Sequence, residues 1–177
     1  MKLLLHICCG PCALYPISQI ARTKFERIVG FYYNPNIHPP SEYKRRKDTL
    51  QSAEKKLGLE VVYPPYKIAE YFRKIASYEE STDRCKLCWE LRLSQTADFA
   101  KKNGFNAFTT TLLVSPYQDH DLVKDIGRKE ASEKGIEFYY EDFRKGFRAS
   151  QKEAKEQGLY TQKYCGCVFS ELERVKV

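Results

Sequence analysis

Apolar residues recur along the chain in short runs, separated by longer segments that mix charged and apolar residues at helical spacing. The short runs predict strands at residues 2–7, 27–33, 59–63, 107–113 and 136–140. The longer segments predict helices at about 13–23, 41–57, 68–76, 87–103 and 119–134, with shorter helices at 150–156 and 168–174. Gly58, Gly104 and Gly135 follow the three longest helices, as expected of glycine at a helix C-terminus.

Strands that alternate with helices are typical of an α/β fold with a parallel sheet and helices on both faces. No repeat, low-complexity tract or linker divides the chain, so we expect residues 1–177 to form one domain, with C-terminal helical segments carrying the last pair of cysteines. Ligands of such sheets bind outside the carboxyl ends of the strands. The loop from Cys8 to Cys12 follows the first predicted strand and is therefore expected at the functional edge.

The 177 residues are 42% hydrophobic, enough to bury a core without disulfide staples. No apolar run approaches the length of a membrane span. Met1, Lys2 and three leucines resemble the start of a signal peptide, but His6, the Cys8–Cys9 pair and Pro11 interrupt the run. We therefore expect a cytoplasmic protein that does not contact a membrane.

Seven cysteines fall in three groups, Cys8-Cys9-x-x-Cys12, Cys85-x-x-Cys88 and Cys165-x-Cys167. Grouped thiols in a reducing compartment are more often metal ligands or redox-active than structural. Cys85 and Cys88 are predicted at the start of a helix, where the helix dipole would lower the pKa of a thiol. The spacing indicates metal binding or redox chemistry.

The spacing of the cysteines does not decide between a zinc site and an iron–sulfur cluster. One closed zinc site needs four ligands, which leaves Cys165 and Cys167 unexplained. An iron–sulfur cluster held by about four cysteines, with the others as a redox pair or as ligands of a second metal, uses more of them. Gly166 would let Cys165 and Cys167 close an easily reduced disulfide. Cys12 is interpreted as a small packing residue.

Taken together, the motifs resemble those of the QueH-type, cobalamin-independent epoxyqueuosine reductases. They follow in order over nearly the whole chain: His-x-Cys-Cys-x-Pro-Cys from His6, Arg-Cys-x-x-Cys-Trp-x-x-Arg-Leu from Arg84, Ser-Pro-Tyr-Gln from Ser115 and Tyr-Cys-Gly-Cys from Tyr164. Members of this family reduce the epoxide of epoxyqueuosine to the alkene of queuosine in tRNA. The resemblance thus implies an oxidoreductase that acts on tRNA and takes electrons from a donor that the sequence does not identify.

The resemblance also implies a role for each pair of cysteines. Cys8, Cys9, Cys85 and Cys88 would bind an iron–sulfur cluster of the 4Fe–4S type, and an additional iron is a further expectation. Cys165 and Cys167 would be the catalytic redox pair or further iron ligands. The implied fold resembles the nucleotide-binding α/β group that includes ATP-dependent tRNA-thiolating enzymes. Their Ser-Gly-Gly phosphate loop is replaced here by Cys-Cys-Gly-Pro-Cys, which disfavours ATP hydrolysis and thiolation.

Removing an epoxide oxygen as water consumes two electrons and two protons, so a proton donor is required. His6, between apolar neighbours, is interpreted as a hydrogen-bonded core histidine, and Asp119 stands where a helix N-cap is expected. The residues that flank the motifs and could supply a proton are Asp83, Tyr117, Asp119, His120 and Asp121.

A net charge of +7 suits a polyanionic partner such as tRNA. Basic residues gather at 45–47, 55–56, 101–102 and 144–148, although such runs are usually solvated helix faces. Two other functions stay open: a metal-free thiol–disulfide oxidoreductase that uses Cys85 and Cys88, and a zinc-bearing RNA-binding module without catalysis.

Overall fold

Five parallel strands form the centre of the computed structural model, which describes residues 1–78 and 81–175. Their order is β3-β2-β1-β4-β5, so β1 lies in the middle and the chain crosses over after β3. Leu3, Leu4 and Leu5 of β1 are fully buried because helices cover both sides of the sheet. The strands are β1 (Lys2–His6), β2 (Arg27–Phe31), β3 (Glu60–Val62), β4 (Ala107–Thr110) and β5 (Glu137–Phe138).

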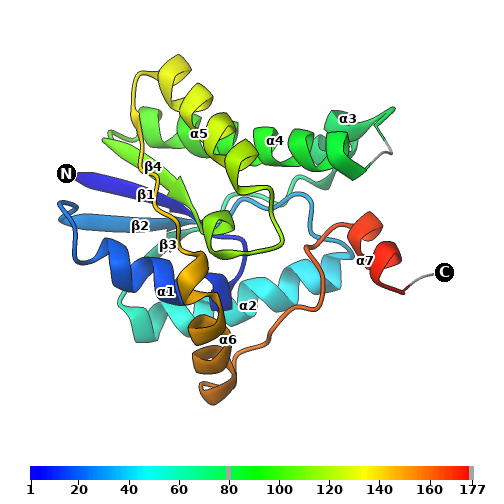
Figure 1. Ribbon diagram of the computed structural model, residues 1–177, viewed down its shortest axis with the longest axis horizontal. Helices are drawn as coiled ribbons and strands as arrows, with labels where there is room; N and C mark the ends of the chain where they lie inside the picture. Colours follow the sequence, from blue (N-terminus) through cyan, green and yellow to red (C-terminus); the bar gives the residue numbers. More distant parts are fainter. Residues whose placement is uncertain (79–80, 176–177) are drawn as a thin grey trace.

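The helices divide into two layers (Figure 1). One face of the sheet carries α1 (Gly10–Ile20), α2 (Pro40–Leu57) and α6 (Phe147–Glu156), and the other carries α3 (Ile68–Ile75), α4 (Ser81–Lys102) and α5 (His120–Lys134). The chain then passes over α2 to α7 (Val168–Val175). This arrangement confirms the predicted α/β class with a parallel sheet and helices on both faces. None of the described helices is long and apolar enough to cross a membrane.

Several predicted boundaries are wrong at the site. The strand expected at 107–113 ends at Thr110, whose side chain accepts a hydrogen bond from the amide of Leu112 and begins a 3-10 turn, η1 (Thr111–Val114). The helix expected from residue 13 begins at Gly10. The helix expected from residue 87 begins at Ser81, because its first turns pack on α3 through an apolar cluster that includes Tyr71, Ile75 and Cys88.

Gly58 and Gly135 end α2 and α5 in the left-handed conformation, with φ of 60° and 63°, as the sequence predicts.

Candidate active site

All seven cysteines are free thiols. Cys8 and Cys9 directly follow β1, and Cys12 lies in the first turn of α1. Cys85 and Cys88 lie in the second and third turns of α4, while Cys165 and Cys167 belong to the segment before α7. The fold therefore joins thiols from the beginning, the middle and the end of the sequence.

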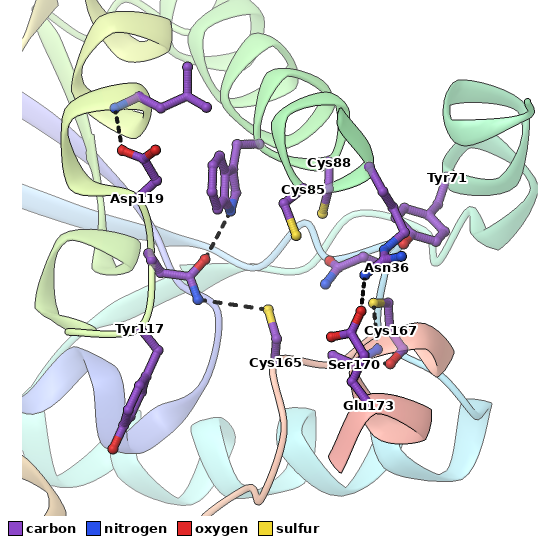
Figure 2. Close-up of a pocket in the computed structure, with 14 residues that line it drawn as sticks. Asn36, Tyr71, Cys85, Cys88, Tyr117, Asp119, Cys165, Cys167, Ser170 and Glu173 are labelled. Atoms are coloured by element: carbon purple, nitrogen blue, oxygen red, sulfur yellow. Dashed lines mark hydrogen bonds and ion pairs between the residues drawn. The ribbon is translucent and has the colours of Figure 1, made fainter. Parts of the chain in front are cut away.

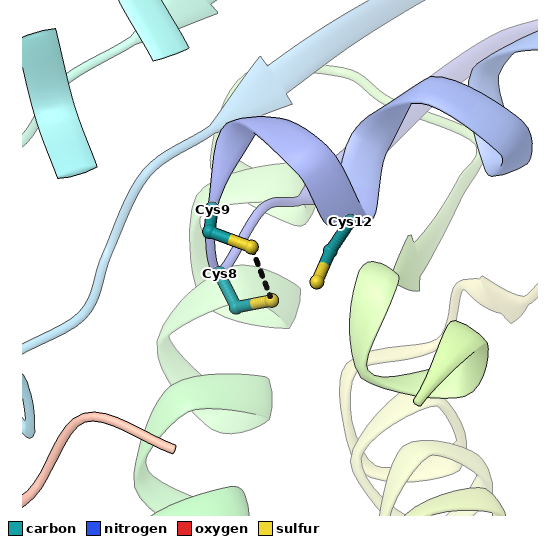
Figure 3. A group of neighbouring side chains, drawn as sticks. All are labelled: Cys8, Cys9 and Cys12. Atoms are coloured by element: carbon teal, nitrogen blue, oxygen red, sulfur yellow. Dashed lines mark hydrogen bonds between the residues drawn. The ribbon is translucent and has the colours of Figure 1, made fainter. Parts of the chain in front are cut away.

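Cys8, Cys9 and Cys12 form a compact group at the N-terminus of α1 (Figure 3). Their sulfur atoms all lie within 4.8 Å of one another, and Cys8 Sγ is 3.9 Å from Cys9 Sγ. The early start of α1 places Cys9 at its N-cap, so Cys12 turns back towards the other two thiols. Cys12 is buried, as a packing residue would be, but it also belongs to a group that could hold a metal ion.

Polar side chains from distant segments contact this group. The hydroxyl of Thr111 donates to Cys8 Sγ over 3.2 Å, and the same oxygen accepts from the amide of Cys8 over 3.0 Å. Gln162 Nε2 donates to Cys9 Sγ over 2.8 Å and lies 3.6 Å from Cys12 Sγ. Thr111 and Gln162 are contacts that the sequence did not predict.

The three thiols differ in acidity. Hydrogen bonds from Cys12 and Cys9, together with the positive charge of Arg92 and the Thr111 hydroxyl, hold the pKa of Cys8 well below its ordinary value, although burial opposes them. Burial raises the pKa of Cys9, and the hydrogen bonds to Cys8 and Cys9 raise that of Cys12. A thiolate in this group is thus stabilised by its neighbouring thiols, by Thr111 and by Arg92, and the thiolate is the form of cysteine that binds a metal.

A pocket of about 380 Å³ holds the other four cysteines (Figure 2). Cys85 and Cys88 reach into it from α4, and Cys165 and Cys167 face them from the C-terminal segment. The volume lies in the range of pockets that take small molecules. The residues that line it are Asn36, Tyr71, Arg84, Cys85, Cys88, Trp89, Tyr117, Gln118, Asp119, Leu122, Cys165, Cys167, Ser170 and Glu173.

One side of the pocket is a hydrogen-bonded chain that ends at a thiol. Trp89 Nε1 donates to Gln118 Oε1 over 3.0 Å, and Gln118 Nε2 points to Cys165 Sγ at 3.9 Å (Figure 2). The indole thus fixes the amide so that its N–H groups face the sulfur. Tyr117, 82% exposed, stands at the mouth of the same pocket. An exposed aromatic ring beside a pocket is a surface on which a nucleobase can stack.

The segment that carries Cys165 and Cys167 is held by backbone contacts. Arg46 donates to the carbonyl oxygens of Cys165 and Tyr164 over 2.9 and 3.1 Å. The amide of His38 donates to the carbonyl of Gly166 over 2.7 Å. Gly166 has φ of 144°, and a Cβ there would lie 3.1 Å from Ile37. Glycine between the two cysteines is therefore required by the backbone and by close packing.

The expected lowering of the Cys85 and Cys88 pKa values is wrong. Because α4 begins at Ser81, neither thiol caps the helix N-terminus. Burial and the nearby Cys165 thiol instead raise the pKa of Cys85 to about 11. Burial also raises the pKa of Cys88 to about 12. Both are protonated at neutral pH in the metal-free protein, so a metal ion would have to displace their protons.

The proton-donor candidates from the sequence differ in whether they line the pocket. Asp119 lines the pocket, and one of its carboxylate oxygens accepts from the amide of Leu122, which confirms it as the N-cap of α5. Tyr117 also lines the pocket. Asp83 and Asp121 are exposed and do not line it, and the ring of His120 is buried against the carbonyl of Leu113. Of the five candidates from the sequence, Asp119 and Tyr117 are therefore the two that line the pocket.

His6 is a core histidine, as predicted. It is fully buried, with Nδ1 2.8 Å from Thr110 Oγ1 and Nε2 3.3 Å from the carbonyl of Tyr33. Burial, followed by the charge of Arg92, lowers its pKa to about 3, so the ring is neutral. Among the basic residues at 45–47, Arg46 is buried and paired with Glu42, while Arg45 lies over the ring of Tyr160 at 3.7 Å.

Known proteins resemble this chain over almost its full length. Two curated relatives are both called epoxyqueuosine reductase QueH. The one from Dehalococcoides mccartyi is 38% identical over 98% of this chain and 94% of its own, and the one from Thermotoga maritima is 36% identical over 97% and 91%.

A solved structure of a deacetylase from the biosynthesis pathway of teicoplanin shares the fold alone. It matches 78% of this chain and 65% of its own with a TM-score of 0.53 and 12% identity. The family model described as "Epoxyqueuosine reductase QueH" matches residues 3–173. The three groups of cysteines and the residues that line the pocket all fall within that match, and the chain belongs to the QueH family of epoxyqueuosine reductases, which are oxidoreductases.

Proposed function

We propose that this protein reduces epoxyqueuosine to queuosine in tRNA and uses an iron–sulfur centre to do so. The observation that carries the proposal is the grouping of seven free thiols from three segments: three form a compact group at the N-terminus of α1, and four line a pocket of about 380 Å³. Family membership supplies the reaction. The pocket's size supports a modified nucleobase as its occupant.

The cluster ligands in this proposal are Cys8, Cys9, Cys85 and Cys88, in a cluster of the 4Fe–4S type. Thiolates are the usual ligands of iron–sulfur clusters. Cys8 and Cys9 would supply sulfur from the segment after β1, and Cys85 and Cys88 would supply it from α4. Arg92 supports the grouping, since its charge acts on both Cys8 and Cys88. Cys12, which shares the compact group with Cys8 and Cys9, is the residue that would let the site accept an additional iron.

The reaction consumes two electrons and two protons and releases the epoxide oxygen as water. A bound iron–sulfur group would supply the electrons one at a time and a Lewis-acidic iron for the departing oxygen. The chain would supply the rest. Cys165 and Cys167 face the pocket and would serve as the redox pair, whose oxidation to a disulfide returns two electrons to the iron–sulfur group, while Gln118 aligns the Cys165 thiol. Asp119 and Tyr117 are the groups from which a proton can reach the substrate.

The partners follow from the substrate. A tRNA that carries epoxyqueuosine would present its anticodon base to the pocket, and Tyr117 at the mouth would stack on a neighbouring base. An electron donor must renew the reducing equivalents after each turnover. We place the protein in the cytoplasm, where thiols stay reduced and tRNA is modified.

Anaerobic purification followed by iron and sulfide analysis tests the proposal. The expected result is a brown protein that contains iron and sulfide and converts epoxyqueuosine in tRNA with a chemical reductant. Fully active protein without iron would contradict the cluster and favour a thiol–disulfide oxidoreductase. Stoichiometric zinc without turnover would instead favour an RNA-binding module. Colourless, inactive protein that regains neither property on anaerobic reconstitution would exclude the reductase.

A further inference from the structure

Arg92 is a fully enclosed cation beneath the thiols. Its side chain projects from α4 one turn after Cys88, and the residue is 1% exposed. Its Nη2 donates to Asn34 Oδ1 over 2.8 Å, and its Nε lies 3.4 Å from His6 Nε2. Neither acceptor is an anion, since one is an imidazole nitrogen and the other an amide oxygen. The guanidinium therefore has hydrogen-bond partners that do not compensate its charge.

No carboxylate pairs with Arg92 in the part of the chain that the structure describes. The other two buried arginines are different, since Arg46 Nε lies 2.7 Å from Glu42 and Arg84 Nη2 lies 2.5 Å from Glu173. A buried charge without a counter-charge is strongly unfavourable, and a guanidinium stays charged at every working pH. The compensating negative charge must therefore come from another kind of group.

Sulfur is the group that faces this cation. Cys88 precedes Arg92 by one turn of α4, so the two side chains share a face of the helix. Cys8 follows two residues after His6, whose Nε2 lies 3.4 Å from Arg92 Nε, and the charge of Arg92 acts on Cys88, Cys8 and Cys165. These three residues come from the three different cysteine motifs of the sequence. The charge of Arg92 thus acts on at least one thiol of each of the three cysteine motifs.

We propose that Arg92 is the built-in counter-cation of the sulfur centre, a positioning residue that strengthens metal binding by the thiolates and raises the reduction potential of the centre. This inference builds on the iron–sulfur part of the proposed function. A cluster held by four thiolates has a net negative charge, and reduction adds another. A fixed neighbouring cation favours both the bound and the reduced state, because charge and hydrogen bonding around the sulfurs set the potential.

Two measurements on the full-length chain test the role without using tRNA or epoxide. The first is the affinity of the metal-free protein for Co²⁺, which is measured from the thiolate-to-metal absorbance that appears on binding. The second is the midpoint potential of the reconstituted centre in a dye-mediated titration. The variants are Arg92→Gln and Arg92→Met, which remove the charge, and Arg92→Lys, which keeps it. Arg22→Gln is the charge control, because Arg22 is exposed just after α1, away from the thiols.

The neutral variants should bind Co²⁺ at least tenfold more weakly than the wild type. Their one-electron reduction constant should also be at least tenfold smaller, which corresponds to a midpoint potential at least 59 mV lower. Arg92→Lys and Arg22→Gln should stay within threefold of the wild type in both measurements. Unchanged affinity and potential in folded Arg92→Gln or Arg92→Met would overturn the proposal. If neither neutral variant folds, a tenfold loss in folded Arg92→Lys overturns it and retention supports it. Failure of the reductase assay alone would leave both measurements intact.

Discussion

Gln162 donates a hydrogen bond of 2.8 Å to the sulfur of Cys9, although the two residues are 153 positions apart. Gln162 follows α6 and Cys9 precedes α1, so the bond ties the end of the chain to the first cysteine motif. Its Oε1 is buried without a partner among the described atoms, whereas its N–H group is satisfied by sulfur. The side chain thus acts as a donor to the group of Cys8, Cys9 and Cys12, which could hold a metal ion.

Gln162→Leu should weaken the binding of the proposed iron–sulfur group, because it removes the hydrogen bond to Cys9. The substitution keeps a similar side-chain volume. A hydrogen bond to a charged group contributes about 1.5–3 kcal/mol, which corresponds to an increase of roughly 10- to 100-fold in the rate of iron loss to a chelator. The measurement is the decay of the visible absorbance under excess chelator. Gln157→Leu is the matched control, since the side chain of Gln157 donates to Glu153 at the end of α6 rather than to a thiol. Equal decay rates in the two variants would rule out the role of Gln162.

Serine substitutions should separate the ligands from the redox pair. Cys85→Ser should lower the iron bound per chain to below about half, because an alcohol is a poor ligand for iron–sulfur clusters. Cys165→Ser should keep its iron and lose turnover by about 100-fold, since its thiol faces the pocket and is exposed. Iron analysis and single-turnover assays on each variant give the two readouts. Loss of iron in Cys165→Ser would assign Cys165 to the ligands instead.

Gly166→Ala should destabilise the fold and misplace Cys165 and Cys167. The φ of 144° is unfavourable for any residue with a Cβ, and that Cβ would meet Ile37 at 3.1 Å. The expected loss is about 1–3 kcal/mol in the free energy of unfolding, measured by urea denaturation of the metal-free protein. Gly158→Ala is the comparison, because Gly158 has φ of 68° and open space where its Cβ would be. It should cost about 1–2 kcal/mol and leave turnover unchanged.

The neutral state of His6 predicts a loss of stability in acid. In the unfolded chain the ring takes a proton near pH 6.5, whereas in the fold its pKa is about 3. The unfolded state therefore binds more protons between these values, so stability is complete above pH 6.5 and falls as the pH drops towards 3. At pH 5 the loss from this group is about 2 kcal/mol.

Urea denaturation of wild type and His6→Gln at pH 7 and pH 5 isolates this contribution, because the carboxyl groups affect both proteins alike. The wild type should lose more stability than the variant between the two pH values. Parallel losses in the two proteins would show that His6 titrates normally in the fold.

The sequence pattern predicts the sheet, most helices and the edge where the thiols gather, because those features follow from periodic burial. It fails for Cys85 and Cys88, since the start of α4 is set by packing of Cys88 against Tyr71 of α3 rather than by local propensity. The C-x-x-C spacing of Cys9 and Cys12 was a signal that would have joined Cys12 to its neighbours. Gln162 and Thr111 have no comparable signal, because their roles come from contacts between segments far apart in the sequence.

The bond between Gln162 and Cys9 also sets an order of events during synthesis. Cys8, Cys9 and Cys12 are made first, and Gln162, which contacts Cys9, is added 153 positions later. Cys165 and Cys167 follow later still. On the ribosome the first thiols therefore have neither their hydrogen-bond donor nor the far wall of the pocket. The grouping of thiols that we propose as the cluster site is therefore complete only after Gln162, Cys165 and Cys167 have been translated.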